Sequence, residues 1–64
     1  MDDFERSILE ATEAAGVAGL CLEGRIEIGV QAARRLRPDL DDATLTRRVT
    51  AVLRAAGEAD DAPG

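Results

Sequence analysis

The chain contains no histidine, and it has a single cysteine, Cys21, and a single aromatic residue, Phe4. Without histidine, the usual general base near neutral pH is missing, so neither a Cys-His nor a Ser-His catalytic pair can be assembled. One cysteine cannot form an internal disulfide, and without histidine it cannot provide a four-ligand zinc site. We therefore expect a protein that is not an enzyme and that carries no cofactor. We expect Cys21 itself to be a small buried hydrophobic residue.

The shortness of the chain limits its stability. A domain of roughly 60 residues buries only about 60% of the surface of its unfolded chain, and this chain has 64 residues. Disulfides, a metal or a partner subunit usually compensate for so small a core. Since the first two are missing, we expect self-association into a dimer or higher assembly, together with binding to another protein.

Long hydrophobic runs are also lacking, because charged residues make up 33% of the chain and interrupt its aliphatic segments. No apolar run approaches the roughly 18 residues of a membrane span, and the first residues lack the basic and apolar regions of a signal peptide. We expect a cytoplasmic protein without membrane contact. Its net charge of -5 is unevenly distributed: residues 25–54 hold seven arginines against four acids, while residues 1–24 hold one arginine against six acids.

The first predicted helix covers residues 3–15. Asp2 or Asp3 can cap its N-terminus, and Gly16 is suited to the left-handed conformation that commonly follows a helix. Apolar residues recur with helical periodicity and define the face expected to be buried. They are Phe4, Ile8, Ala11 and Ala15.

A second clear helix is predicted over residues 42–56, with Asp41 as its N-cap and Gly57 after its end. Leu40 and Leu45 have the spacing of a hydrophobic staple. The apolar stripe consists of Leu45, Val49, Val52, Leu53 and Ala56. We assign residues 1–57 to a single helical domain and residues 58–64 to a disordered acidic tail.

The segment between these helices supports two interpretations. A helix from about residue 20 to residue 36 gathers apolar residues on an arc of roughly 200°. A β-hairpin at about residues 19–30 is the alternative, because Leu20, Leu22, Ile26 and Ile28 alternate with polar or small residues. We favour the helix, since an isolated two-stranded hairpin is marginally stable and the rest of the chain offers no third strand. The predicted fold is all-α, a small three-helix bundle completed by homo-oligomerisation, with an α+β fold as the alternative.

The wide apolar arc of the middle helix is more than two short neighbours need to cover. We therefore predict an interface on this helix, formed by Leu22, Arg25, Ile26, Glu27, Val30 and Ala33. The expected function is that of a small interaction module or an accessory or regulatory subunit.

Two other functions stay open. A helix-turn-helix-like DNA-binding regulator would offer Arg47, Arg48 and Arg54 to phosphates, although the acidity of the chain argues against nucleic acid as a partner. A carboxylate metal site assembled between subunits would use Glu23 and Glu27, which lie one helical turn apart. A solvated acidic face explains this pair more simply.

Overall fold

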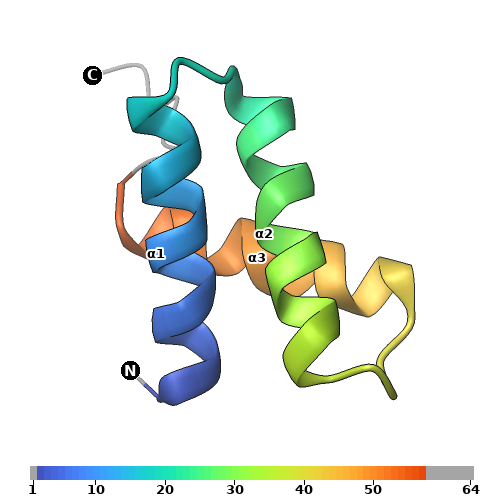
Figure 1. Cartoon of the computed structure of the whole chain (residues 1–64). Coiled ribbons are helices and arrows are strands. Elements are labelled where there is room, and N and C mark those ends of the chain that lie inside the picture. Colours follow the sequence, from blue (N-terminus) through green and yellow to red (C-terminus); the bar gives the residue numbers. More distant parts are fainter. Residues whose placement is uncertain (1, 58–64) are drawn as a thin grey trace.

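A computed structural model describes residues 2–57 of the chain. It contains three helices, α1 (Asp3–Val17), α2 (Leu22–Leu36) and α3 (Asp42–Ala55). Helices α1 and α2 lie side by side and antiparallel, and α3 crosses behind both (Figure 1). The all-α prediction is thus confirmed. Among these helices, none is long and apolar enough to cross a membrane.

The hairpin alternative at residues 19–30 is wrong, because residues 2–57 contain no strand and α2 begins at Leu22. As a helix, the segment buries Gly29 and Ala33 at helical spacing against its neighbours. A two-stranded hairpin without a third strand would leave more of its backbone and one face exposed. The predicted disordered tail, residues 58–64, lies outside the described residues.

Side-chain caps fix the N-termini of α1 and α3. The carboxylate of Asp2 accepts a hydrogen bond of 2.8 Å from the backbone N–H of Glu5, whose own carboxylate accepts one from the Asp2 N–H. This reciprocal pair is a capping box. At α3, Asp41 accepts a 2.8 Å hydrogen bond from the backbone N–H of Thr44. Both predicted caps are confirmed.

The C-terminus of α1 lies two residues beyond the predicted end. Gly16 remains helical, and Gly19 takes the left-handed conformation with φ of 92°. The Leu20 N–H donates to the Ala15 carbonyl at 3.0 Å, and the Gly19 N–H donates to the Gly16 carbonyl at 3.0 Å. These two bonds define a Schellman motif one turn further along than the sequence pattern indicated.

All three helices contribute to one hydrophobic core. Its members follow the predicted stripes of α1 and α3 closely, except that Ala56 is exposed. The buried cluster consists of Ile8, Ala33, Leu45, Val49, Val52 and Leu53. Phe4 and Leu40 are partly buried and pack against this cluster.

The three helices meet most closely at Gly29 of α2. A Cβ atom at this position would lie 2.7 Å from Cγ1 of Val49 in α3 and 2.8 Å from Cγ2 of Thr12 in α1. Thr12 is fully buried, and its hydroxyl donates a hydrogen bond of 3.0 Å to the Leu9 carbonyl of its own helix. Its methyl group therefore faces α2. Any side chain larger than hydrogen at residue 29 would therefore push both neighbours away.

We expect Gly29→Ala to destabilise the protein by about 1–2 kcal/mol. Two contacts below 3 Å place the cost in the upper part of the usual range of about 1–3 kcal/mol for overpacking, and the gain of about 1 kcal/mol in helix propensity then leaves a net loss of about 1–2 kcal/mol. Chemical denaturation followed by circular dichroism measures the change.

Gly24→Ala is the matched control, since Gly24 is also helical in α2. Its new Cβ would meet Leu20 alone, at 2.8 Å from Cδ2 and 3.2 Å from Cβ. Leu20 lies in the connection between α1 and α2 and is 40% exposed, so a small shift of this residue costs less than separating packed helices at Gly29. Equal destabilisation by both substitutions would show that close helix approach is not what requires glycine at position 29.

Candidate functional site: a groove between α2 and α3

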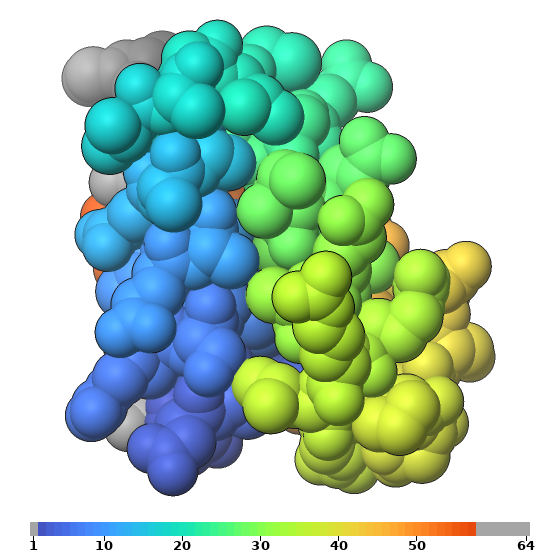
Figure 2. All heavy atoms as spheres, in the orientation of Figure 1, coloured from blue at the N-terminus to red at the C-terminus, as the bar shows by residue number. Residues whose placement is uncertain are grey.

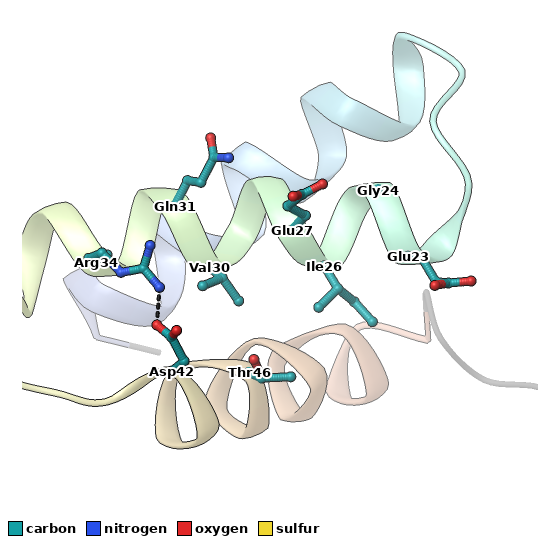
Figure 3. Close-up of a pocket in the computed structure, with 9 residues that line it drawn as sticks. All are labelled: Glu23, Gly24, Ile26, Glu27, Val30, Gln31, Arg34, Asp42 and Thr46. Carbon is teal, nitrogen blue, oxygen red and sulfur yellow. Dashed lines mark hydrogen bonds and ion pairs between the residues drawn. The ribbon is translucent and has the colours of Figure 1, made fainter.

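An open groove runs between α2 and α3 (Figure 3). Ile26 and Val30 point from α2 toward α3 and form its apolar floor. Both pack against the core while remaining partly exposed. The complete lining consists of Glu23, Gly24, Ile26, Glu27, Val30, Gln31, Arg34, Asp42 and Thr46.

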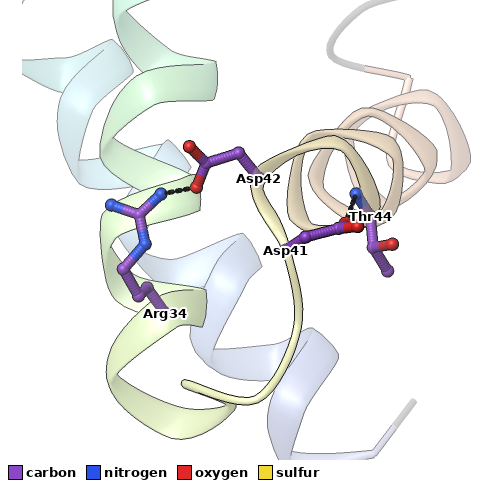
Figure 4. Close-up of polar contacts among 4 residues, drawn as sticks. All are labelled: Arg34, Asp41, Asp42 and Thr44. Atoms are coloured by element: carbon purple, nitrogen blue, oxygen red, sulfur yellow. Dashed lines mark hydrogen bonds and ion pairs between the residues drawn. The ribbon is translucent and has the colours of Figure 1, made fainter.

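One end of the groove is closed by an ion pair between the two helices. The guanidinium of Arg34 donates a hydrogen bond to the carboxylate of Asp42 (Figure 4). Asp42 is the first residue of α3, directly after the N-cap Asp41. The cap fixes where α3 begins, and this start places the Asp42 carboxylate beside the last turn of α2.

The other part of the rim is acidic. Glu23 and Glu27 line the groove, lie one turn apart on α2 and are both exposed. Within residues 2–57, neither carboxylate takes part in an ion pair, whereas the charges of Arg34 and Asp42 compensate each other. The groove therefore has an apolar floor and a net negative rim.

A metal site at Glu23 and Glu27 was predicted only as an assembly between subunits, and it stays a prediction because the structure describes one copy. In the described part of the chain, no group of three or more histidine, cysteine, aspartate or glutamate side chains is placed to hold an ion. Two carboxylates on one exposed helical face are an ordinary solvated pair.

The predicted interface residues of α2 are divided among four environments. Ala33 is fully buried in the core. Arg25 faces α1, where its Nε donates to the Thr12 carbonyl at 3.4 Å. The groove brings together Ile26, Glu27 and Val30, while Leu22, with 42% of its surface exposed, lies beyond the lining at the start of α2.

The connection between α1 and α2 forms a second exposed apolar surface. Val17 is 90% exposed, Leu20 40% and Leu22 42%. Cys21 is exposed as well, so the expectation that it is buried is wrong. It occupies the N-cap position of α2, outside the helical arc from which its burial was inferred, and makes no side-chain cap hydrogen bond.

A signal for this surface was present in the sequence. Residues 14–22 form a run of nine uncharged residues in a chain that is one-third charged. We call this run, at the α1–α2 connection, the uncharged end. Helical periodicity does not reveal this run, because it spans the end of α1, the turn and the first residue of α2.

The three arginines considered for nucleic acid are exposed on α3. Arg47 and Arg54 lie on the surface, and the guanidinium of Arg48 stacks over the Phe4 ring of α1 at 5.2 Å from its centroid. Such a cation–π contact ties Arg48 to the bundle. One of the three arginines thus already has an intramolecular role.

Comparison with known proteins adds no assignment: no family model, curated protein or solved structure matches the chain.

The cap that positions the groove end makes stability depend on pH. Hydrogen bonding from Thr44, through its hydroxyl and its backbone N–H, lowers the pKa of Asp41 from its ordinary value of 3.8. A group with a lowered folded-state pKa stabilises the fold above its unfolded pKa, and this stabilisation is lost as the pH falls through the folded value. We expect the melting temperature to fall below about pH 4.

Asp41→Asn separates this cap from the other carboxylates, because asparagine caps as well as aspartate but does not titrate in this range. Thermal melts at pH 7 and pH 3 should show a smaller acid-induced loss in Asp41→Asn than in the original chain. Asp41→Ala should melt earlier at both pH values. Equal acid sensitivity of Asp41→Asn and the original chain would contradict a titrating cap. Asp39, whose pKa is lowered by hydrogen bonding from Arg37, keeps contributing in every variant.

Proposed function

We propose that the protein is a non-catalytic interaction module or accessory subunit that acts as a homo-oligomer, with the uncharged end as the contact between copies. The observation that carries this proposal is the exposure of apolar side chains there, led by Val17 at 90%. Exposed apolar patches on small proteins commonly mark interaction sites.

The location of the uncharged end favours contact with another macromolecule. It forms one extremity of the molecule, where the turn between α1 and α2 projects (Figures 1 and 2). No charged residue lies between Glu13 and Glu23 to hinder desolvation. Association would bury Val17, Leu20 and Leu22 without burying an uncompensated charge among them.

A second copy is the partner that this surface fits best. Beside Val17 lies a shallow hollow lined by Glu13, Gly16 and Arg25. In a two-fold contact the same patch meets itself, so that each residue faces the symmetry mate of another. An uncharged apolar patch such as Val17, Leu20 and Leu22 satisfies this requirement, because it can pack against its own copy and bring no like charges together.

The small core supplies a thermodynamic reason for association. A chain of this length buries a low fraction of its surface by folding alone. The fully buried residues of the core are few, namely Ile8, Thr12, Ala33, Leu45, Val49 and Leu53. Contact between copies would add apolar burial at about 25 cal/mol per Å².

Val17→Lys tests the proposal. The position is 90% exposed, and a cation in the last turn of a helix interacts favourably with the helix dipole. The variant should therefore keep its helical circular dichroism while its dimer dissociates. Native mass spectrometry and sedimentation velocity should find a dimer for the original chain and a monomer for Val17→Lys.

Ala51→Lys on the exposed surface of α3 is the matched control and should remain dimeric. Alkylation of the exposed Cys21 gives an independent readout, because the thiol should react more slowly as the protein concentration rises and the uncharged end becomes covered. A monomeric original chain, or an unchanged dimer in Val17→Lys, would refute the proposal.

A further inference from the structure

We propose that the groove between α2 and α3 binds an amphipathic helix of another protein whose apolar ridge is flanked by basic residues. This inference concerns a surface separate from the uncharged end and does not depend on self-association there. Helix-in-groove recognition is a common mode of protein binding, in which apolar residues one turn apart enter a hydrophobic furrow.

The dimensions of the groove suit about three turns of a helix. Its lining on α2 extends from Glu23 to Arg34, which at 1.5 Å per residue corresponds to about 16 Å. Ile26 and Val30 lie one turn apart along this length and both point toward α3 (Figure 3). They offer adjacent contacts for apolar side chains spaced i and i+4 on a bound helix.

The rim charges determine the kind of helix. Arg34 and Asp42 compensate each other at one end, so that the remaining charge comes from Glu23 and Glu27. These carboxylates stand one turn apart on the same side of the floor, and both are exposed. A ligand with lysine or arginine beside its apolar ridge would pair with them, whereas an acidic helix would be repelled.

A second copy of the chain does not offer such a helix. The arginines of α3 are exposed, but the apolar stripe of that helix is buried, since Leu45, Val49 and Leu53 are inaccessible to solvent. At the uncharged end, Glu13 and Arg25 both line the hollow beside Val17, so basic residues do not flank the apolar side chains on both sides. Leu36 at the end of α2 is 49% exposed and lies between Arg35 and Arg37, but a single leucine does not provide the apolar pair spaced i and i+4 that would contact the floor of the groove. We therefore assign the groove to a different protein.

Anionic membrane surfaces are also disfavoured as the occupant. The negative potential of anionic lipid headgroups attracts basic segments, and the free charges on the groove rim are acidic. A basic peptide and an anionic vesicle thus make opposite predictions for the same surface.

The test uses a pair of synthetic 15-residue peptides. Both carry leucine at i, i+4, i+7 and i+11; one has lysine at the flanking positions, and its twin has glutamate there. In ¹⁵N-labelled protein, the lysine peptide should shift amide resonances of groove residues such as Ile26, Val30 and Thr46. By fluorescence anisotropy the glutamate twin should bind at least about tenfold more weakly, because like charges at an interface are strongly unfavourable.

Substitution of the rim should weaken binding of the lysine peptide. We expect Glu23→Gln/Glu27→Gln to raise its Kd about fivefold, since each exposed ion pair contributes modestly, and to reduce its salt dependence. Asp3→Asn/Glu10→Gln removes the same charge from α1, outside the groove, and should leave the Kd within about twofold because screening weakens distant charges.

Several results would overturn the inference. They are the absence of saturable binding, equal binding of both peptides, resonance shifts confined to another face, and an unchanged Kd in Glu23→Gln/Glu27→Gln. Dissociation of a dimer by the peptide would assign the groove to a second copy, and binding of anionic vesicles at the groove would assign it to a membrane.

The Val17→Lys variant separates this inference from self-association. A monomeric Val17→Lys protein should bind the lysine peptide as the original chain does. Loss of peptide binding in that variant would show that the groove does not act on its own and would contradict the inference.

Discussion

The close approach of three helices at Gly29 is the constraint on which the rest of the structure depends. A hydrogen atom in place of a side chain lets Thr12 of α1 and Val49 of α3 come within contact of the α2 backbone. The adjacent buried residue of α2 is Ala33, which is also small. The small residues Gly29 and Ala33 let the three helices approach closely around this small buried core.

The same approach creates the surfaces that we associate with function. Since Gly29 and Ala33 fill the space at the centre of the bundle, the larger side chains of α2 lie at its edges. Ile26 and Val30 point toward α3, where they form the floor of the groove. Arg25 is displaced toward α1, where it reaches the Thr12 carbonyl. The predicted interface residues of α2 therefore lie on different sides of the helix.

Local features were predictable to within a residue or two. Asp2 and Asp41 cap helices because their carboxylates reach backbone N–H groups three residues ahead, a relation that needs no tertiary contact. The stripes of α1 and α3 follow from helical periodicity alone. Gly16 was a reasonable C-terminal signal for α1, but the sequence contains Gly19 as well, and local propensity does not choose between two glycines three residues apart.

The sequence by itself determined the first and third helices, their N-terminal caps, their apolar stripes and the lack of histidine chemistry, because each rests on residue identity or on residues near one another in the chain. Only the tertiary structure decided that residues 22–30 form a helix rather than a hairpin, that Thr12 belongs to the core, and that Cys21 is exposed. The groove was likewise beyond the sequence, since its floor belongs to α2 and one of its walls to α3. The distance between two helices depends on which small residues of the two helices come into contact. The periodicity of each helix does not specify those contacts.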